Sequence, residues 1–194
     1  MASSGEEIQF YGFPYQDTQQ FNLVCVASLD GERILLGKKT RGFGKDKFVL
    51  PGGKSTFWVT QGAQVARRSP SYDAHLELKQ ETGIDVPHTM LNHLGWLMIE
   101  QFDEEEPRSI DVFTTRAHPK YTPLTPSDEF ASLSWYPVDT LPYDAMPADY
   151  PLWLPHAIRS EPFMATLAET ADGSFTGKVF AAQEPSRRFV GTTY

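Results

Sequence analysis

Apolar and β-branched residues in this chain gather in short runs that are bounded by turn residues. Runs at 21–29 and 33–39 flank Asp30-Gly31, a dipeptide typical of tight hairpins, and runs at 94–102 and 109–117 are separated by an acidic segment. We therefore expect two antiparallel hairpins. Further strands are expected at residues 47–50, 133–137, 163–169 and 174–180.

One segment, residues 72–82, has its apolar residues at helical spacing. Pro70 suits the first turn of a helix, and either Ser69 or Ser71 can cap it with a side-chain oxygen. Gly83 follows as a stop signal. The sequence therefore predicts a helix that ends at this glycine.

A second helix is expected at residues 150–159, although only Pro151 of its two prolines suits a helix N-terminus. Strands combined with a helix on each side of a sheet predict an α/β sandwich. We expect a single domain with a core at about 20–182 and peripheral tails at 1–19 and 183–194.

Composition is that of an ordinary globular protein, with 194 residues and 40% hydrophobic content. The formal net charge of −8 argues against nucleic-acid polymers and anionic membranes as partners, while leaving small phosphorylated ligands open. Cys25 is the single cysteine, so an intrachain disulfide is excluded and a reducing compartment is expected. We expect a cytoplasmic monomer without a membrane span, with the nucleus and the mitochondrion left open as locations.

Two carboxylates, Glu77 and Glu81, lie four residues apart on the first expected helix and therefore share one face. Their like charges repel, and Mg²⁺ would relieve this because it binds through one or two carboxylates together with substrate phosphates. Lys79 and Arg67 are alternative sources of positive charge, and such a pair is also common on solvated helices.

The order of these features resembles the Nudix hydrolase superfamily. A strand-like run is followed by Pro51-Gly52-Gly53-Lys54, and the helix ends in Leu76-Glu77-Leu78-Lys79-Gln80-Glu81-Thr82-Gly83-Ile84, which is similar to the second half of that family's motif. The resemblance implies a Nudix-type α/β/α sandwich with a mixed β-sheet. Segments similar to the branch that hydrolyses oxidised purine nucleoside triphosphates such as 8-oxo-dGTP occur at 34–44, 111–113, 127–129, 134–135 and 146–149.

The resemblance implies Mg²⁺, or alternatively Mn²⁺, as the cofactor. Gly53 would contribute a turn at the metal site, where Glu77, Gln80 and Glu81 match the ligand positions. Glu77, Glu81 and Glu129 are the implied catalytic residues, with Glu129 as an auxiliary carboxylate that binds metal or acts as a base. A solvated loop carboxylate is the alternative for Glu129.

Substrate contacts are implied at Lys39, Phe43, Val49, Asp149 and Trp153. Phe43 and Asp149 match the base pocket of the resembled branch, whereas Val49 replaces an asparagine of that branch. A tryptophan and a second aspartate of the branch are also replaced, by Pro147 and Tyr150. An apolar pocket is therefore expected, although its residues are alternatively part of the core: Phe43, Phe48, Val49, Trp96, Met98, Met146 and Trp153.

The motif also departs from the family. Leu76 stands where the family has an arginine, Gln80 replaces the middle glutamate, and Arg68 occupies the position of the loop glutamate. The loop at 55–69 is longer than the family's, through a genuine insertion or an error in the gene model. Arg67 and Arg68 either contact phosphate or are solvated.

Two functions follow from these observations. The first is a Mg²⁺-dependent hydrolase that cleaves the diphosphate linkage of a nucleoside triphosphate, including oxidised purine forms, or of another nucleoside diphosphate derivative. The second is a degenerate domain with weak or no hydrolysis, which would serve as a ligand-binding or scaffold protein.

Overall fold

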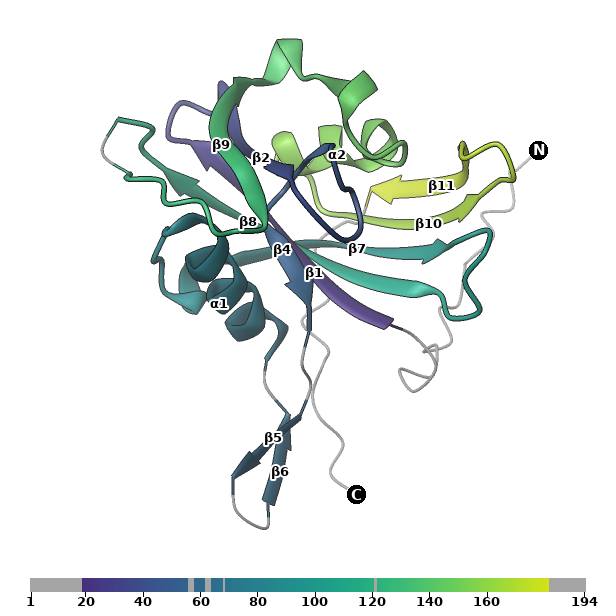
Figure 1. Cartoon of the computed structure of the whole chain (residues 1–194), viewed down its shortest axis with the longest axis horizontal. Coiled ribbons are helices and arrows are strands. Elements are labelled where there is room, and N and C mark those ends of the chain that lie inside the picture. The colour runs from purple at the N-terminus through teal and green to yellow at the C-terminus, as the bar shows by residue number, and fades with distance from the viewer. Residues whose placement is uncertain (1–18, 56–57, 62–63, 68, 121, 182–194) are drawn as a thin grey trace, which may run out of the picture.

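The two expected hairpins lie side by side in a mixed β-sheet (Figure 1). The computed structural model describes residues 19–55, 58–61, 64–67, 69–120 and 122–181. Strand β1 (Gln19–Ser28) pairs antiparallel with β2 (Arg33–Lys39), and β7 (Asn92–Glu100) pairs antiparallel with β8 (Arg108–Ala117). β1 also runs parallel to β8, so the two hairpins join into one sheet.

The nine strands of this sheet follow the order β11-β10-β7-β8-β1-β2-β3, with β4 paired to β1 and β9 paired to β2. The expected strands are confirmed, with β9 beginning earlier than predicted and β3 reduced to two residues. The remaining strands and the short 3-10 helices are β3 (Phe48–Val49), β4 (Gly52–Lys54), β9 (Phe130–Pro137), β10 (Phe163–Glu169), β11 (Phe175–Ala181), η2 (His88–Met90), η3 (Val138–Thr140) and η4 (Tyr143–Ala145).

Helix α1 (Pro70–Thr82) has the predicted ends. Ser69, rather than Ser71, is the N-cap, and its hydroxyl accepts a hydrogen bond from the Tyr72 amide at 3.3 Å. Gly83 ends the helix in the left-handed conformation with φ 78°, which glycine adopts without strain. These caps fix where the last turn, and with it Glu81, lies.

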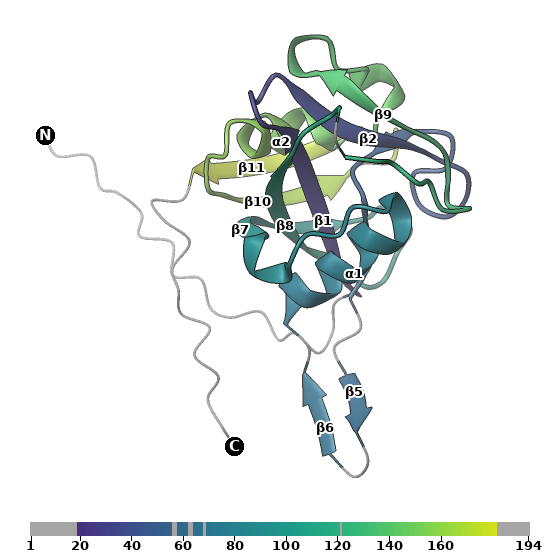
Figure 2. The ribbon, with the colours of Figure 1, turned by 90° about the vertical axis from the view of Figure 1, so that its left-hand side faces the viewer.

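The two helices cover opposite faces of the sheet, as expected for an α/β/α sandwich (Figure 2). Alternation along β1 decides which residues meet which helix: Val24 and Val26 pack in the cluster with α1, whereas Cys25 and Ala27 pack in the cluster with α2. Helix α2 (Tyr150–Ile158) keeps Pro155 inside it and contributes the buried Trp153 and Leu154 to the core.

The segment predicted as a long loop at 55–69 contains a two-stranded hairpin instead, formed by β5 (Trp58–Gln61) and β6 (Gln64–Arg67). This hairpin projects away from the nine-stranded sheet (Figures 1 and 2). The inward-facing backbone groups of β5 and β6 pair with each other, which a structureless insertion would not achieve. Arg68 and the predicted tails, apart from residues 19 and 20, lie outside the described residues, and phosphate binding by Arg67 stays a prediction.

The Gly52-Gly53 pair forms strand β4 rather than the predicted turn. Gly53 pairs with Asn22 and Gly52 with Leu23, so the backbone here belongs to the sheet edge. A Cβ on Gly52 would lie 2.1 Å from the Asn22 carbonyl oxygen, and its φ of 149° also favours glycine. The close approach of two strands therefore explains the glycine. In the described part of the chain, every helix is too short or too polar to cross a membrane.

Candidate active site

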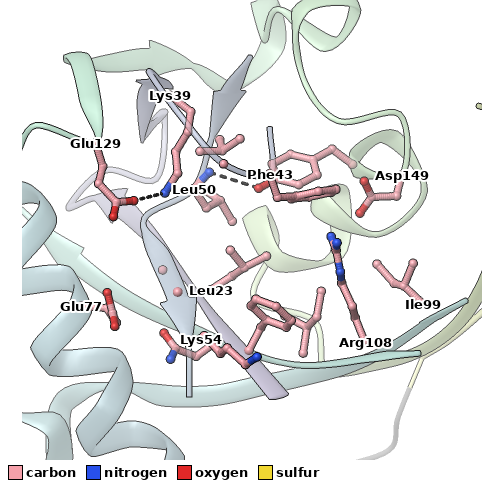
Figure 3. Close-up of a pocket in the computed structure, with 18 of the residues that line it drawn as sticks. Leu23, Lys39, Phe43, Leu50, Lys54, Glu77, Ile99, Arg108, Glu129 and Asp149 are labelled. Carbon is pink, nitrogen blue, oxygen red and sulfur yellow. Dashed lines mark hydrogen bonds and ion pairs between the residues drawn. The ribbon is translucent and has the colours of Figure 1, made fainter. Parts of the chain in front are cut away.

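A cavity of about 440 Å³ is lined by residues of α1 and β4, by side chains of β1 and β8, and by residues at the start of α2 (Figure 3). This volume is in the range of small-molecule sites in proteins. Carboxylates from α1 and from the segment before β9 lie at one end, whereas Ile99, Arg108 and Asp149 lie at the other (Figure 3). The cavity is therefore chemically asymmetric.

The acidic end joins three carboxylates with one lysine. Lys39 Nζ lies 3.2 Å from Glu81 Oε1 and 2.6 Å from Glu129 Oε2, and thus links residues that are far apart in the sequence. Glu77 lies one helical turn before Glu81 and lines the same cavity. The structure therefore brings together the three residues predicted as catalytic.

Burial sets the protonation of these carboxylates. It raises the pKa of Glu81 to about 7, although Lys39 and the Gly52 amide oppose that shift. Burial also raises the pKa of Glu77, helped by the negative charge of Glu129. The pKa of Glu129 is instead lowered by its hydrogen bond from Lys39, so Glu129 is ionised at neutral pH.

Strand β4 holds the carboxylates of α1 in place. The Gly52 amide donates a hydrogen bond to Glu81 Oε2 at 2.7 Å. A Cβ added to Gly53 would lie 2.9 Å from both the carboxyl carbon and Oε2 of Glu77, so a side chain there would displace that carboxylate. Gly53 thus leaves room for the Glu77 carboxylate, a role that its predicted place in a turn did not indicate.

The acidic end suits a hard divalent cation that is shared with a ligand. No group of three or more His, Cys, Asp or Glu side chains is arranged to hold a metal by itself within the described ranges. The buried carboxylate of Glu81 and the half-buried carboxylate of Glu77 both have raised pKa values. Beside the Cβ-free cradle at Gly53, they nevertheless offer oxygen donors whose repulsion Mg²⁺ or Mn²⁺ would relieve. Such an ion would complete its coordination with ligand phosphates and water.

Buried polar groups of α2 form part of the opposite end. Asp149 is 4% exposed, lines the cavity and accepts a hydrogen bond from Trp153 Nε1 at 2.8 Å. Burial raises the pKa of Asp149, and the Trp153 bond only partly offsets the shift. The hydroxyl oxygen of Tyr150 accepts a hydrogen bond from the Leu50 amide at 3.2 Å.

The cavity differs in its apolar walls from the prediction. Phe43 and Val49 line it as expected. Trp153 is fully buried behind Asp149, where it orients that carboxylate rather than lining the space. The other predicted wall residues belong to the core or its margin and do not line the cavity: Phe48, Trp96, Met98 and Met146.

Several lining residues were not predicted, and strand alternation could have found them. Phe21 and Leu23 project from one face of β1, and Arg108 and Ile110 project from the same face of β8. Gln80, in contrast, is exposed on α1 and is not part of the cavity lining. The structure therefore does not bring Gln80 to the cavity with Glu77 and Glu81.

Comparison with known proteins places these features in context. No family model matches the chain. The chain is 32% identical over 142 residues to an oxidized purine nucleoside triphosphate hydrolase of Danio rerio, covering 73% of this chain and 82% of that protein.

Solved structures with the same fold include a MutT protein from Bacillus halodurans, with a TM-score of 0.64, 22% identity, and coverage of 83% of this chain and 97% of that one. A bifunctional NMN adenylyltransferase/ADP ribose pyrophosphatase from Francisella tularensis, complexed with AMP and a manganese ion, matches with a TM-score of 0.51 and 16% identity over 76% of this chain and 43% of that one.

Proposed function

Because the chain belongs to the Nudix hydrolase superfamily, close to its oxidised-purine nucleoside triphosphatase branch, we propose that it hydrolyses the diphosphate linkage of a nucleoside triphosphate with a divalent cation at Glu77 and Glu81. Oxidised purine nucleotides are the first substrates to consider, and other nucleoside diphosphate derivatives follow. The observation that carries the proposal is the meeting of Glu77, Glu81, Glu129 and Lys39 at one end of a nucleotide-sized cavity.

The cation would be Mg²⁺, with Mn²⁺ as a substitute, held by the Glu77 and Glu81 carboxylates beside Gly53. When bound, such an ion polarises phosphoryl oxygens and lowers the pKa of a water molecule. Gln80, which also matches a ligand position, would have to reach the ion from its exposed place on α1.

The protein's own groups position the phosphates and move the proton. Lys39 is partly buried between Glu81 and Glu129, and its ammonium group is available to pair with an incoming phosphate oxygen. The carboxylate of Glu129 is ionised at neutral pH because Lys39 lowers its pKa, so it can accept a proton from an attacking water. Glu129 is therefore our candidate for the general base.

The far end of the cavity would hold the nucleoside. Val49, Leu50 and Ile99 supply apolar contacts for a base. Burial raises the pKa of Asp149 and so favours its protonated form, which is the form that would donate a hydrogen bond to a base. Phe43 lies over this end on the loop between β2 and β3 (Figure 3).

Release of phosphate or pyrophosphate from a panel of normal and oxidised nucleoside triphosphates, nucleoside diphosphate conjugates and prenyl diphosphates tests the proposal. We expect release that requires Mg²⁺ or Mn²⁺ and that Glu81→Gln abolishes, because the amide lacks the charge of the carboxylate. Glu100→Gln is the matched control, since Glu100 is exposed at the end of β7 and does not line the cavity. Release that persists in Glu81→Gln would contradict the assigned site.

A binding protein without hydrolysis is the second candidate. It is favoured by the exposed position of Gln80 and by Leu76, which occupies the place of the family's motif arginine. This candidate predicts nucleotide binding with no metal-dependent release from any substrate. Recovery of release after Gln80→Glu together with removal of the β5–β6 hairpin would support it.

We also propose that the protein is a cytoplasmic monomer that acts on a small-molecule phosphoanhydride. Cys25 is fully buried, and burial raises the pKa of its thiol to about 12, which keeps it in the unreactive protonated form. An inert free thiol is consistent with the reducing compartment expected from the sequence.

A further inference from the structure

Arg108 is a buried cation at the nucleoside end of the cavity, and the proposed hydrolysis does not use it. Its guanidinium carbon lies 4.2 Å from the centre of the Phe43 ring and 5.5 Å from that of Phe21. Its Nη2 forms an ion pair with Glu104. The two rings therefore hold the guanidinium plane, while Glu104 balances its charge.

Two buried polar atoms, both on cavity-lining residues, have no hydrogen-bond partner among the described residues. One is Nε of Arg108, which is 9% exposed, and the other is Oε1 of Gln101. Ile99 is the direct cross-strand partner of Arg108, and Gln101 follows Ile99 by two positions, so Gln101 and Arg108 share one face of the β7–β8 hairpin. Both residues line the cavity.

Buried polar atoms are normally hydrogen-bonded, so this pair indicates what a ligand must supply. Arg108 Nε–H requires an acceptor. Because Glu104 already neutralises the guanidinium, a neutral carbonyl oxygen fits better than a second anion. Gln101 Oε1 requires an N–H donor. A carbonyl next to a ring N–H meets both requirements.

We propose that Arg108 and Gln101 determine base specificity by binding the lactam edge of an oxopurine or oxopyrimidine. The carbonyl oxygen would accept from Arg108 Nε–H, and the adjacent ring N–H would donate to Gln101 Oε1. Adenine and cytosine present an amino group and an unprotonated ring nitrogen at the same edge, which would place donor against donor and acceptor against acceptor. The proposal rests on the proposed function for its nucleotide ligand.

Arg108 and Gln101 would supply polar contacts to the base that the altered pocket positions of the resembled branch do not supply in this chain. Val49 and Tyr150 occupy two of those altered positions. Val49 has no polar side-chain atom, and the Tyr150 hydroxyl oxygen already accepts from the Leu50 amide, so that hydroxyl offers the base only its O–H. The polar contacts would instead come from the β7–β8 hairpin, on the opposite side of the cavity from the glutamates of α1 (Figure 3).

Equilibrium binding of IMP and AMP in the presence of Mg²⁺ tests the proposal by calorimetry. These nucleotides differ only in the carbonyl and ring N–H that replace the amino-bearing edge, and neither contains a diphosphate linkage, so the result does not depend on hydrolysis. We expect the wild-type protein to bind IMP about tenfold or more tightly than AMP. Arg108→Met should reduce this preference to about twofold or less by weakening IMP binding while leaving AMP binding nearly unchanged.

Gln101→Met is the second variant, because it removes the acceptor without touching the ion pair, and it should also reduce the IMP preference. Arg116→Met is the matched control, since Arg116 is exposed on the same strand and does not line the cavity. Urea unfolding checks that each variant is folded. Equal binding of IMP and AMP by the wild-type protein, binding of neither, or a preference that survives in both variants would overturn the proposal, while the release assay judges hydrolysis separately.

Discussion

Replacement of Glu81 by glutamine should change how the stability of the metal-free protein depends on pH. Burial raises the pKa of Glu81 from 4.5 to about 7 in the folded protein, so the folded state binds the proton more tightly than the unfolded state. The stability that this group contributes is therefore fully present below about pH 4.5 and is lost as pH rises through about 7. A glutamine cannot ionise and does not undergo this loss.

The size of the effect follows from the difference of about 2.5 between the ordinary pKa of a glutamate, 4.5, and the folded-state pKa of Glu81, about 7. At 1.36 kcal/mol per unit, the free energy of unfolding of Glu81→Gln should gain about 3 kcal/mol on the wild-type value between about pH 4.5 and pH 8. Any constant cost of the amide, such as its poorer contact with Lys39, cancels in this difference between two pH values. Because Glu81 is only 3% exposed, solvent screening reduces the estimate little.

Urea unfolding of both proteins in EDTA, followed across this pH range, measures the difference. Glu100→Gln, at the exposed end of β7, should run parallel to the wild-type curve. Added Mg²⁺ should restore the wild-type stability at high pH and leave Glu81→Gln nearly unaffected, because an ion that binds only the folded state stabilises it by mass action. Parallel curves for Glu81→Gln and the wild type would refute the assignment of a costly buried charge to Glu81.

Two further substitutions test the support of the site. Gly53→Ala should reduce nucleotide hydrolysis about tenfold or more, because the new Cβ would lie 2.9 Å from the Glu77 carboxyl carbon and displace that carboxylate. The control Gly173→Ala, in the β10–β11 turn, should leave turnover unchanged in the same assay. Trp153→Phe should lower the free energy of unfolding by about 1–3 kcal/mol, because it removes the hydrogen-bond donor to the buried Asp149 and leaves a small void. Urea unfolding measures the change, and an unchanged midpoint would contradict the role of Trp153 in holding Asp149.

Local patterns were sufficient for most of the fold. The helix of the glutamates could be placed because Ser69, Pro70 and Gly83 are signals that act on their own neighbours. The turn predicted at Gly53 was wrong, because both glycines of this pair answer contacts with other parts of the chain. Strand β1 approaches too closely for a side chain at Gly52, and the Glu77 carboxylate fills the space beside Gly53. Contacts of this kind depend on sheet pairing and cannot be read from local sequence.

The site shows the same division. Helical spacing alone placed Glu77 and Glu81 on one face, and the resemblance then favoured a metal site over a solvated helix face. For Glu129 and Lys39 the resemblance was needed from the start, because their meeting depends on the pairing of β2 with β9. Arg108 was missed because β8 has the pattern of an ordinary strand, and a charged residue at the first position of a strand is usually solvated. Its alternation with Ile110 would have placed it on the cavity face, had the orientation of that face been known.

The charges at the acidic end explain how a reduced motif can still suit a cation. Glu77, Glu81 and Glu129 carry three formal negative charges when ionised, and Lys39 returns one, which leaves a formal charge of −2 at the cavity end. Arg41 pairs with Asp128 at 3.1 Å and with Glu129 at 3.5 Å, and counting both Arg41 and Asp128 leaves the formal charge at −2. One divalent ion balances this charge, whereas several ions would leave an excess positive charge that only substrate phosphates could compensate. Gln80 is exposed and does not line the cavity, so the charge at this end does not depend on it. That charge matches one divalent ion placed, as proposed, between α1 and the phosphates of a nucleotide.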